Sequence, residues 1–337
     1  MSSTQRVNAA WGSAVPKVAP VAIDDIRAAR RRIRDSVLRT PLIPWGGPPG
    51  KAPVFLKLEN LQPTGSFKVR GAGNSIELAV EWGRAAGVFT TSNGNMAQAL
   101  AWHARRLGVP CTAVVSDSAP QVKLEGIRRY GAEIISLPWN EIWAIIAEGR
   151  YRPLSHLQYI HPFNSPPMIA GNGTAALEVL EELPDVRKVF VPFGGGGLAC
   201  GVASALRDLS PHVEVIACES DTAAPFTESL KAGSPSEIER TPSFVDAIGN
   251  RSVVPEMWAR LAGLVRSSRT VSLARAADCI RRAFHSHHIV VEGAGAVPIA
   301  AALDEPGSDG PVVAIVSGGN IDPSRFGAIL AGGVPGP

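Results

Sequence analysis

The chain has 337 residues, which is enough for two domains or for one large α/β unit with a substantial buried core. Apolar residues make up 45% of it and charged residues 19%, a composition that excludes a disordered protein. The formal net charge of +3 is small for this length, and no apolar run approaches the roughly 20 residues of a membrane span.

The first predicted element is a basic helix near the N-terminus. Residues 1–20 lack the apolar core of a secretory signal. They carry Arg6 and Lys17 without an acidic residue, which would also suit an organelle transit peptide, but we expect them to form a flexible tail. The run RAARRRIRDSVLR at 27–39 could contact nucleic acid, but Ile26, Ile33 and Val37 have helical spacing. No recognition motif accompanies it, so we interpret it as the solvated face of an amphipathic helix and expect no nucleic-acid partner.

Short β-branched runs alternate with helical stretches along the rest of the chain. Strands are predicted at 86–92, 111–116, 132–137, 188–194, 214–220 and 312–319, with helices at 96–107 and 121–130 among them. Strands separated by single helices predict an α/β fold of open, mostly parallel sheets with helices on both faces.

Metal-binding patterns are weak in this sequence. The four cysteines lie far apart, which is typical of core thiols in a reducing cytoplasm, so we expect a cytoplasmic protein. His285, His287 and His288 lie at a predicted helix end without matching cysteines or acids, which favours a solvated turn over a metal site.

Three segments rich in glycine and polar residues follow predicted strands. They are SNGN at 92–95, GGGG at 194–197 and SGGN at 317–320. Parallel sheets bind ligands beyond the carboxyl ends of their strands, so the three segments together predict one shared site.

The run of four glycines at 194–197 lies between a predicted strand and a predicted helix. Without Cβ atoms, the backbone can direct its N–H groups at one point beside the positive end of the helix, which suits a phosphate. Neither a Walker loop nor a GxGxxG pattern is present here, which disfavours a nucleotide. The alternative is a flexible turn that binds no ligand.

The remaining polar groups have two interpretations each. The segment 92–95 could bind a carboxylate or a ring hydroxyl, or could simply cap the helix that follows it. Ser317 could bond a ligand atom or cap a helix, and Glu292 could be a buried acid or a capping carboxylate. The local sequence leaves these alternatives open.

One lysine, Lys68, lies among turn-forming residues in the segment NLQPTGSFKVRG at 60–71. Taken alone, it could be an ordinary solvated cation. Beside a phosphate cradle that lacks nucleotide features, it suggests a phosphate-bearing aldehyde cofactor, because a lysine amine can form a Schiff base with pyridoxal phosphate.

Four motifs in the same order carry a resemblance to a known family. They are KLENLQPTGSFKVRGA at 57–72, SNGNMAQ at 92–98, GGGGL at 194–198 and SGGN at 317–320. The chain resembles the serine/threonine dehydratase branch of the fold-type II pyridoxal-phosphate enzymes, which includes serine racemase, over about residues 23–321. The stretches 161–183 and 290–297 also look like parts of this family.

The resemblance assigns roles to individual residues. It makes Lys68 the covalent anchor of pyridoxal 5′-phosphate, and it places Asn95 at the cofactor's ring hydroxyl and Ser317 at its pyridine nitrogen. The implied cofactor-binding residues are Phe67, Lys68, Asn95, Gly194, Gly195, Gly196, Gly197, Leu198, Glu292 and Ser317. The implied substrate-binding residues are Ser66, Ser92, Asn93, Gly94, Asn95 and Met96.

The same resemblance implies a fold of two domains similar to that of the tryptophan synthase β chain. Residues 21–85 and 170–337 would form the large cofactor-binding domain, and residues 86–169 the small domain that carries the substrate loop. A homodimer is usual in this family, so we expect one here.

The implied activity is that of an ammonia-lyase, or dehydratase. Such an enzyme converts a β-hydroxy-α-amino acid such as threonine, serine, hydroxyaspartate or a bulkier relative to a 2-oxo acid and ammonia by α,β-elimination. Alternatives on the same fold are an amino-acid racemase and a β-replacement synthase. A non-catalytic ligand-binding homologue is a further alternative, which the intact Lys68, glycine loop and Ser317 disfavour.

Some positions depart from the family pattern. Asn93 stands where racemases of this family have a serine that acts as an acid/base, and Met96 stands where a histidine is common. Both replacements are expected to face the substrate. Glu219 matches a divalent-cation ligand of some members, but Pro225 replaces the second acid, so we expect no bound metal.

Overall fold

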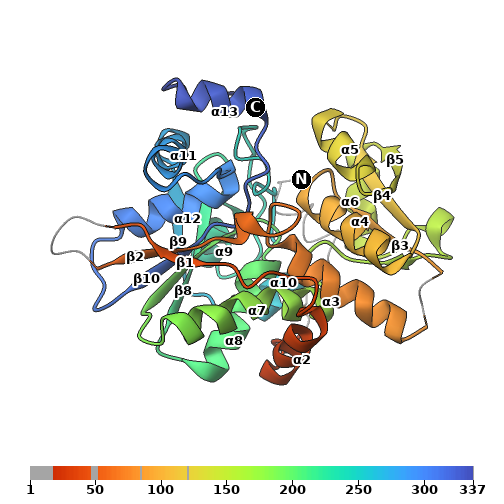
Figure 1. Ribbon diagram of the computed structural model, residues 1–337, viewed down its shortest axis with the longest axis horizontal. Coiled ribbons are helices and arrows are strands. Elements are labelled where there is room, and N and C mark those ends of the chain that lie inside the picture. Colours follow the sequence, from red (N-terminus) through yellow and green to blue (C-terminus); the bar gives the residue numbers. More distant parts are fainter. Residues whose placement is uncertain (1–17, 47–51, 84–85, 120, 337) are drawn as a thin grey trace.

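The computed structural model describes residues 18–46, 52–83, 86–119 and 121–336, and two sheets organise it (Figure 1). Residues 1–17 of the expected tail lie outside this part of the chain. No helix within it is long and apolar enough to cross a membrane.

The larger sheet has the strand order β1-β2-β10-β7-β8-β9, and only the β1–β2 pair is antiparallel. Its strands are β1 (Leu42–Pro44), β2 (Val54–Lys57), β7 (Lys188–Pro192), β8 (Glu214–Ser220), β9 (Ser267–Val271) and β10 (Val312–Ile315). The helices around it are α2 (Ile23–Ile33), α3 (Lys68–Glu81), α7 (Pro166–Glu182), α8 (Gly197–Leu209), α9 (Pro225–Ala232), α10 (Pro255–Leu261), α11 (Leu273–His287), α12 (Gly293–Asp304) and α13 (Pro323–Leu330).

The smaller sheet is wholly parallel, with the strand order β5-β4-β3-β6. Its strands are β3 (Val88–Thr91), β4 (Cys111–Ser116), β5 (Glu133–Leu137) and β6 (Gln158–Tyr159). Its helices are α4 (Asn95–Leu107), α5 (Gln121–Arg128) and α6 (Trp139–Glu148). The expected α/β class with mostly parallel sheets is therefore confirmed.

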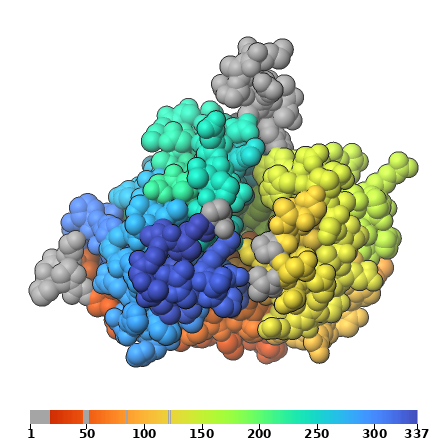
Figure 2. Space-filling model, turned by 90° about the horizontal axis from the view of Figure 1, so that it is seen from above, coloured from red at the N-terminus to blue at the C-terminus, as the bar shows by residue number. Residues whose placement is uncertain are grey.

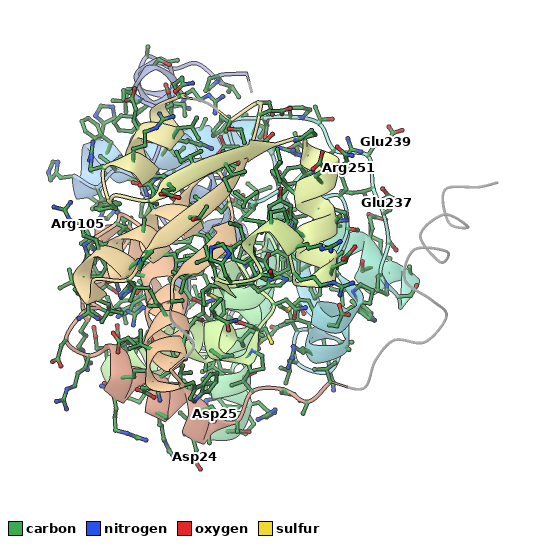
Figure 3. The ribbon with its side chains drawn as sticks, turned by 90° about the vertical axis from the view of Figure 1, so that its right-hand side faces the viewer. Asp24, Asp25, Arg105, Glu237, Glu239 and Arg251 are labelled. Carbon is green, nitrogen blue, oxygen red and sulfur yellow. The ribbon has the colours of Figure 1, made fainter. Side chains whose placement is uncertain are left out.

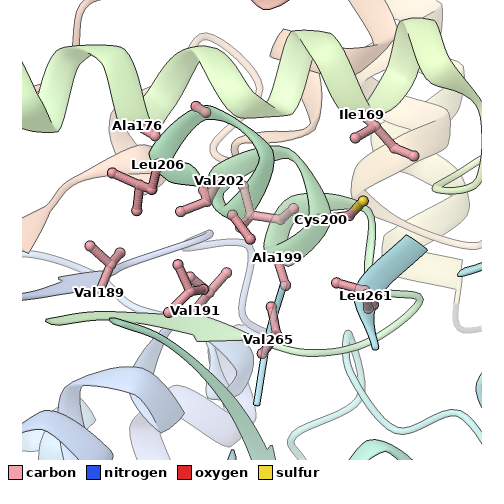
Figure 4. Packing of buried hydrophobic residues seen from close by; sticks show 14 of the residues in the cluster. Ile169, Ala176, Val189, Val191, Ala199, Cys200, Val202, Leu206, Leu261 and Val265 are labelled. Atoms are coloured by element: carbon pink, nitrogen blue, oxygen red, sulfur yellow. The ribbon is translucent and has the colours of Figure 1, made fainter. Parts of the chain in front are cut away.

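Alternating residues along the strands of the larger sheet fill two separate cores. Val189 and Val191 of β7 point to the side of α7 and α8, where Figure 4 shows Val202 and Leu206 of α8 packed over them. Phe190, between those two valines, belongs to the other core, which α11 and α12 cover. This period of two is what a strand buried on both faces requires.

The two sheets form adjacent lobes joined by contacts between side chains. Asp246, in the loop between α9 and α10, accepts hydrogen bonds from Lys123 of α5 at 2.8 Å and from Arg325 of α13 at 3.1 Å. Figure 2 shows the yellow surface of the smaller lobe beside the dark blue region that contains α13. Helix α3 packs on both α4 and α7, so it belongs to the contact between the lobes.

The predicted basic helix begins and ends earlier than expected. Helix α2 buries Ile26 and Ile33 as its spacing predicted, but it ends at Ile33, so the placement of Val37 on the same helix was wrong. The Ser36 hydroxyl and the Val37 N–H both bond the Ile33 carbonyl and close a turn there. Serine favours such local side-chain bonds over continued helix, and a short sequence window does not reveal that competition.

Most charged side chains lie at the surface, but one group of four is enclosed. Figure 3 shows exposed examples such as Asp24, Asp25 and Arg105 pointing away from the ribbon. The enclosed group, which we call the Arg70 network, consists of Lys57, Glu59, Arg70 and Glu178, none more than 5% exposed.

The Arg70 network joins three elements. Arg70 of α3 bonds Glu59, which follows β2, at 2.7 Å and Glu178 of α7 at 2.7 Å. Lys57 of β2 adds an ion pair of 2.7 Å to Glu178. Burial by itself would raise the pKa of Glu59, but Arg70 outweighs this effect and holds that pKa below its usual value.

We expect Arg70→Met to lower the free energy of unfolding by about 3–5 kcal/mol, because it leaves two buried carboxylates without their shared partner. Chemical denaturation measures the change. The control is Arg27→Ala, which breaks an exposed ion pair with Asp24 and should cost less than about 1 kcal/mol. Equal losses in the two variants would contradict the structural importance of the Arg70 network.

Candidate active site

Lys68 is the first residue of α3, and backbone pairing holds the preceding segment against the SGGN segment. The Phe67 N–H donates to the Ser317 carbonyl at 2.9 Å, and Ser66 forms an isolated β-bridge with Gly318. The Gly319 N–H donates to the Gly65 carbonyl at 2.9 Å. The segments 65–67 and 317–319, far apart in sequence, therefore form one wall around the start of α3.

The amine of Lys68 is directed into the protein. Its Nζ donates a hydrogen bond of 3.1 Å to the Pro162 carbonyl, in the connection between β6 and α7. Burial lowers the pKa of this amine to about 8, although the Glu292 carboxylate acts in the opposite direction. The interpretation of Lys68 as an ordinary solvated cation is therefore wrong, and the amine is readily deprotonated near neutral pH.

The glycine run at 194–197 lies between β7 and α8 and leaves no room for side chains at 195–197. A Cβ on Gly195 would overlap the Phe163 ring, and one on Gly197 would lie 2.6 Å from the Phe163 carbonyl. Gly196 has φ +86° and would meet Met257 at 2.7 Å. The loop ends at the N-terminus of α8, where the first N–H groups lack intrahelical acceptors and the helix dipole is positive.

The SNGN and SGGN segments meet through Glu292, the residue before α12. Asn95, the first residue of α4, donates from Nδ2 to the Glu292 carboxylate at 2.9 Å. Asn320 donates from its Nδ2 to Asn95 Oδ1 at 2.8 Å and to the Thr64 carbonyl at the same distance. Burial raises the pKa of Glu292 to about 7, and the bond from Asn95 opposes that rise.

These contacts bring the three segments at 92–95, 194–197 and 317–320 to one place. Two of them touch directly through the bond from Asn320 to Asn95. The glycine loop joins through Phe163, whose neighbour Pro162 accepts the bond from Lys68. Asn95 is in the smaller lobe and Glu292 is in the larger one, so the site lies where the lobes meet.

Three predicted site residues lie differently from the expectation. The Met96 side chain is 2% exposed and packs in a core with Val69 and Leu100, whereas the sequence placed it towards the substrate. Leu198 is likewise a core side chain, and only its backbone is left to contact a ligand. Asn93 accepts a hydrogen bond of 2.7 Å from the Ser116 N–H at the end of β4, which anchors its side chain to the sheet.

The other predicted positions keep polar groups at the site. Ser66 is fully buried, and its hydroxyl has no hydrogen-bond partner among the described residues. Ser317 is 3% exposed, and Ser92 accepts a bond of 3.2 Å from the Gly94 N–H. A buried hydroxyl without a partner is costly, which is consistent with a place for a ligand atom.

The sequence did not reveal which residues connect these parts. Pro162, Phe163 and Asn320 have no assigned role in the motif interpretation, although all three contact predicted site residues. The stretch 161–183 resembles the family, but nothing in its residue types indicates that it links the lysine to the glycine loop.

Glu219 has a structural use in this fold. Its carboxylate accepts bonds from the Phe226 N–H at 2.9 Å, the Thr227 N–H at 2.8 Å and the Thr227 hydroxyl at 2.7 Å. These bonds satisfy the first turn of α9, as a capping acid does. No three His, Cys, Asp or Glu side chains come together as a possible metal site in the described ranges.

Comparison with known proteins identifies the family. Residues 33–318 match the family of pyridoxal-phosphate dependent enzymes, so the chain belongs to that family and pyridoxal phosphate is its cofactor. The L-threonine ammonia-lyase of Geobacter sulfurreducens is 37% identical over 313 residues, which cover 92% of this chain and 78% of the relative. That of Thermotoga maritima is 37% identical over 323 residues, covering 93% and 79%.

Solved structures show the same fold. The serine racemase of maize superposes with a TM-score of 0.82 and 31% identity, covering 93% of this chain and 98% of that one. The processed form of threonine deaminase isoform 2 from Solanum lycopersicum gives a TM-score of 0.81 and 28% identity, covering 94% of each chain. The resemblance to the serine/threonine dehydratase branch of fold-type II enzymes is therefore confirmed.

The residues at the site fit the family's cofactor. The glycine loop at a helix N-terminus suits its phosphate, and Lys68 has an amine of lowered pKa beside that loop. The buried Ser66 hydroxyl offers a group without a partner. The individual binding roles of these residues remain predictions.

We expect Gly195→Ala to weaken pyridoxal-phosphate binding by roughly tenfold to a hundredfold, because the new methyl group displaces Phe163 or distorts the loop. Titration of the cofactor-free protein measures the dissociation constant. Gly263→Ala is the matched control, since its Cβ would meet nothing within 4 Å. Unchanged binding in Gly195→Ala would contradict the phosphate cradle.

We expect the Lys68 amine of the cofactor-free protein to titrate at about 8, compared with the ordinary value of 10.5. Because an ionised Glu292 stabilises the ammonium form, Glu292→Gln should move the midpoint lower still. Competitive acylation across pH 6–11, read by mass spectrometry of the Lys68 peptide, measures both midpoints. A wild-type midpoint near 10.5, or an upward move in Glu292→Gln, would show that the described burial is wrong.

Proposed function

We propose that this chain is an ammonia-lyase that converts a β-hydroxy-α-amino acid to a 2-oxo acid and ammonia. The observation that carries the proposal is the partly buried Lys68 amine, with a pKa of about 8, next to a glycine loop suited to phosphate. Threonine ammonia-lyases at 37% identity over most of the chain support the reaction class.

The chemistry divides between cofactor and protein. Bound pyridoxal phosphate withdraws electrons from the Cα of an amino acid joined to it, which makes the Cα proton acidic. The Lys68 amine takes that proton, and a base with a pKa of about 8 is well matched to proton transfer near neutral pH. The β-hydroxyl would leave together with one proton as water, which balances the proton that Lys68 has taken. Hydrolysis of the released enamine would consume one water and give the 2-oxo acid and ammonia.

Other residues hold and orient the reactants. The N–H groups of the glycine loop and of the α8 N-terminus would hold the phosphate, and the buried Ser317 hydroxyl would be the partner of the pyridine nitrogen. A hydroxyl partner supports less positive charge on that nitrogen than a carboxylate would, which favours elimination over transamination. The backbone of 92–95, at the start of α4, holds the substrate carboxylate, with Asn95 positioned by Glu292.

A racemase is the second candidate, because the serine racemase of maize has the same fold. Racemisation needs an acid/base on the cofactor face opposite the lysine. Asn93 carries an amide, which does not exchange protons usefully near neutral pH, and the Ser116 N–H already occupies its oxygen. This arrangement favours the lyase. A β-replacement synthase remains the third candidate, and it requires a second nucleophilic substrate.

We also propose the remaining organisation on the same basis. Residues 21–85 with 170–337 form the large domain, and 86–169 form the small one, in line with the two separate sheets. A homodimer and a cytoplasmic location are consistent with the family and with the four buried free cysteines.

The decisive experiment measures 2-oxo acid and ammonia from single β-hydroxy amino acids: L-threonine, L-serine, hydroxyaspartate and bulkier analogues. We expect at least one to react, and Lys68→Ala to lower the rate at least about a thousandfold, because the variant lacks the proton-transferring amine. Cα proton exchange without oxo-acid release would favour the racemase. A requirement for a second nucleophile would favour the synthase, and inertness towards every substrate would revive the non-catalytic alternative.

A further inference from the structure

The connection between β6 and α7 contains a turn at 161–164 that is organised by one histidine. The Nδ1 atom of His161 accepts hydrogen bonds from the Phe163 N–H at 3.2 Å and the Asn164 N–H at 2.9 Å. A nitrogen that accepts from two donors carries no proton, so the ring is the tautomer protonated at Nε2. The Phe163 ring makes an edge contact with the imidazole, and the Tyr159 ring lies beside it.

The protonation state of His161 is consistent with its role as a hydrogen-bond acceptor. Burial lowers the pKa of the imidazole to about 4, and the nearby Lys68 cation lowers it further. The Ile146 backbone raises the pKa of the imidazole, but the effect of burial is larger. The ring is therefore neutral across the range in which Lys68 titrates, and Nδ1 stays available as an acceptor.

The turn that His161 shapes contacts both functional parts of the site. The Pro162 carbonyl accepts the bond of 3.1 Å from the Lys68 amine. The Phe163 ring fills the space that a side chain on Gly195 would occupy, and the Phe163 carbonyl lies against Gly197. One four-residue turn thus spans the distance between the amine and the phosphate cradle.

We propose that His161 is a positioning residue for the cofactor, whose unprotonated Nδ1 holds the turn at 161–164 in shape. Through Pro162 the turn orients the Lys68 amine, and through Phe163 it supports the glycine loop. The amine and the cradle must be correctly spaced, because one cofactor is held covalently at one end and by its phosphate at the other. The inference rests on the proposed cofactor site and not on which amino acid reacts.

The competing explanation is that His161 only fills space among Tyr159, Phe163 and their neighbours. The two explanations differ in what can replace it. If His161 only fills space, an apolar side chain of similar size should preserve cofactor binding. If it acts as an acceptor, only a side chain with an oxygen at the position of Nδ1 should do so. Asparagine places Oδ1 close to that position, while glutamine reaches the position of Nε2 instead.

The experiment compares His161→Asn, His161→Gln and His161→Leu in the full chain freed of cofactor. Spectroscopic titration gives the dissociation constant for pyridoxal phosphate, and acylation gives the midpoint of the Lys68 amine. We expect His161→Leu and His161→Gln to bind the cofactor at least about tenfold more weakly, since two hydrogen bonds are lost. His161→Asn should remain within about threefold of wild type and keep the Lys68 midpoint.

Tyr159→Phe is the matched control. It removes one partly buried hydrogen bond of 2.7 Å between the Tyr159 and Thr91 hydroxyls, in the same aromatic group, but leaves the turn intact. Its dissociation constant should match wild type even if its melting temperature falls.

Three results would overturn the proposal: equal binding by His161→Leu and wild type, no recovery in His161→Asn relative to His161→Gln, or weakening of the same size in Tyr159→Phe. If His161→Leu does not fold, the dissociation constants of His161→Asn and His161→Gln still distinguish the two explanations. No substrate is present in these measurements, so failure of the lyase assignment leaves their outcome unaffected.

Discussion

The position of the reactive amine depends on a charge cluster that is sealed from water. Arg70 bonds Glu59 and Glu178 at the same time, and Lys57 completes the group. Buried charges are tolerated only when they are paired with good geometry, so α3 has one position against β2 and α7 that satisfies all four. Lys68 lies two residues before Arg70 on the same helix, and its backbone is placed by that constraint.

The site needs both lobes, which explains why its residues are scattered along the chain. Asn95 comes from the smaller sheet's first helix, and Glu292 from the segment before α12 of the larger lobe. The turn at 161–164 leads from the smaller sheet into α7 and contacts the glycine loop on the way. Parallel strands that end at a common edge make this convergence possible, because each contributes the loop that follows it.

Much of this could be predicted from local patterns. The β-branched runs at 111–116 and 214–220 coincide with β4 and β8, because a strand buried on both faces is apolar at consecutive positions. Helix ends were less predictable, as α2 shows, since it ends at Ile33, where the Ser36 hydroxyl bonds the Ile33 carbonyl. The burial of Met96 was missed because a helix that starts at a ligand loop still turns one side towards the core.

The sequence by itself determined the class of protein, because four motifs in a specific order encode a lysine anchor and a glycine loop whose chemistry is local. Only the tertiary structure decided how that chemistry is tuned. The pKa of Lys68 near 8 comes from burial and from Glu292, which is distant in sequence. The carbonyl that receives the amine belongs to Pro162, and the ring that supports the loop belongs to Phe163. Desolvation and contacts between remote segments arise from packing in three dimensions, so no local pattern reveals them.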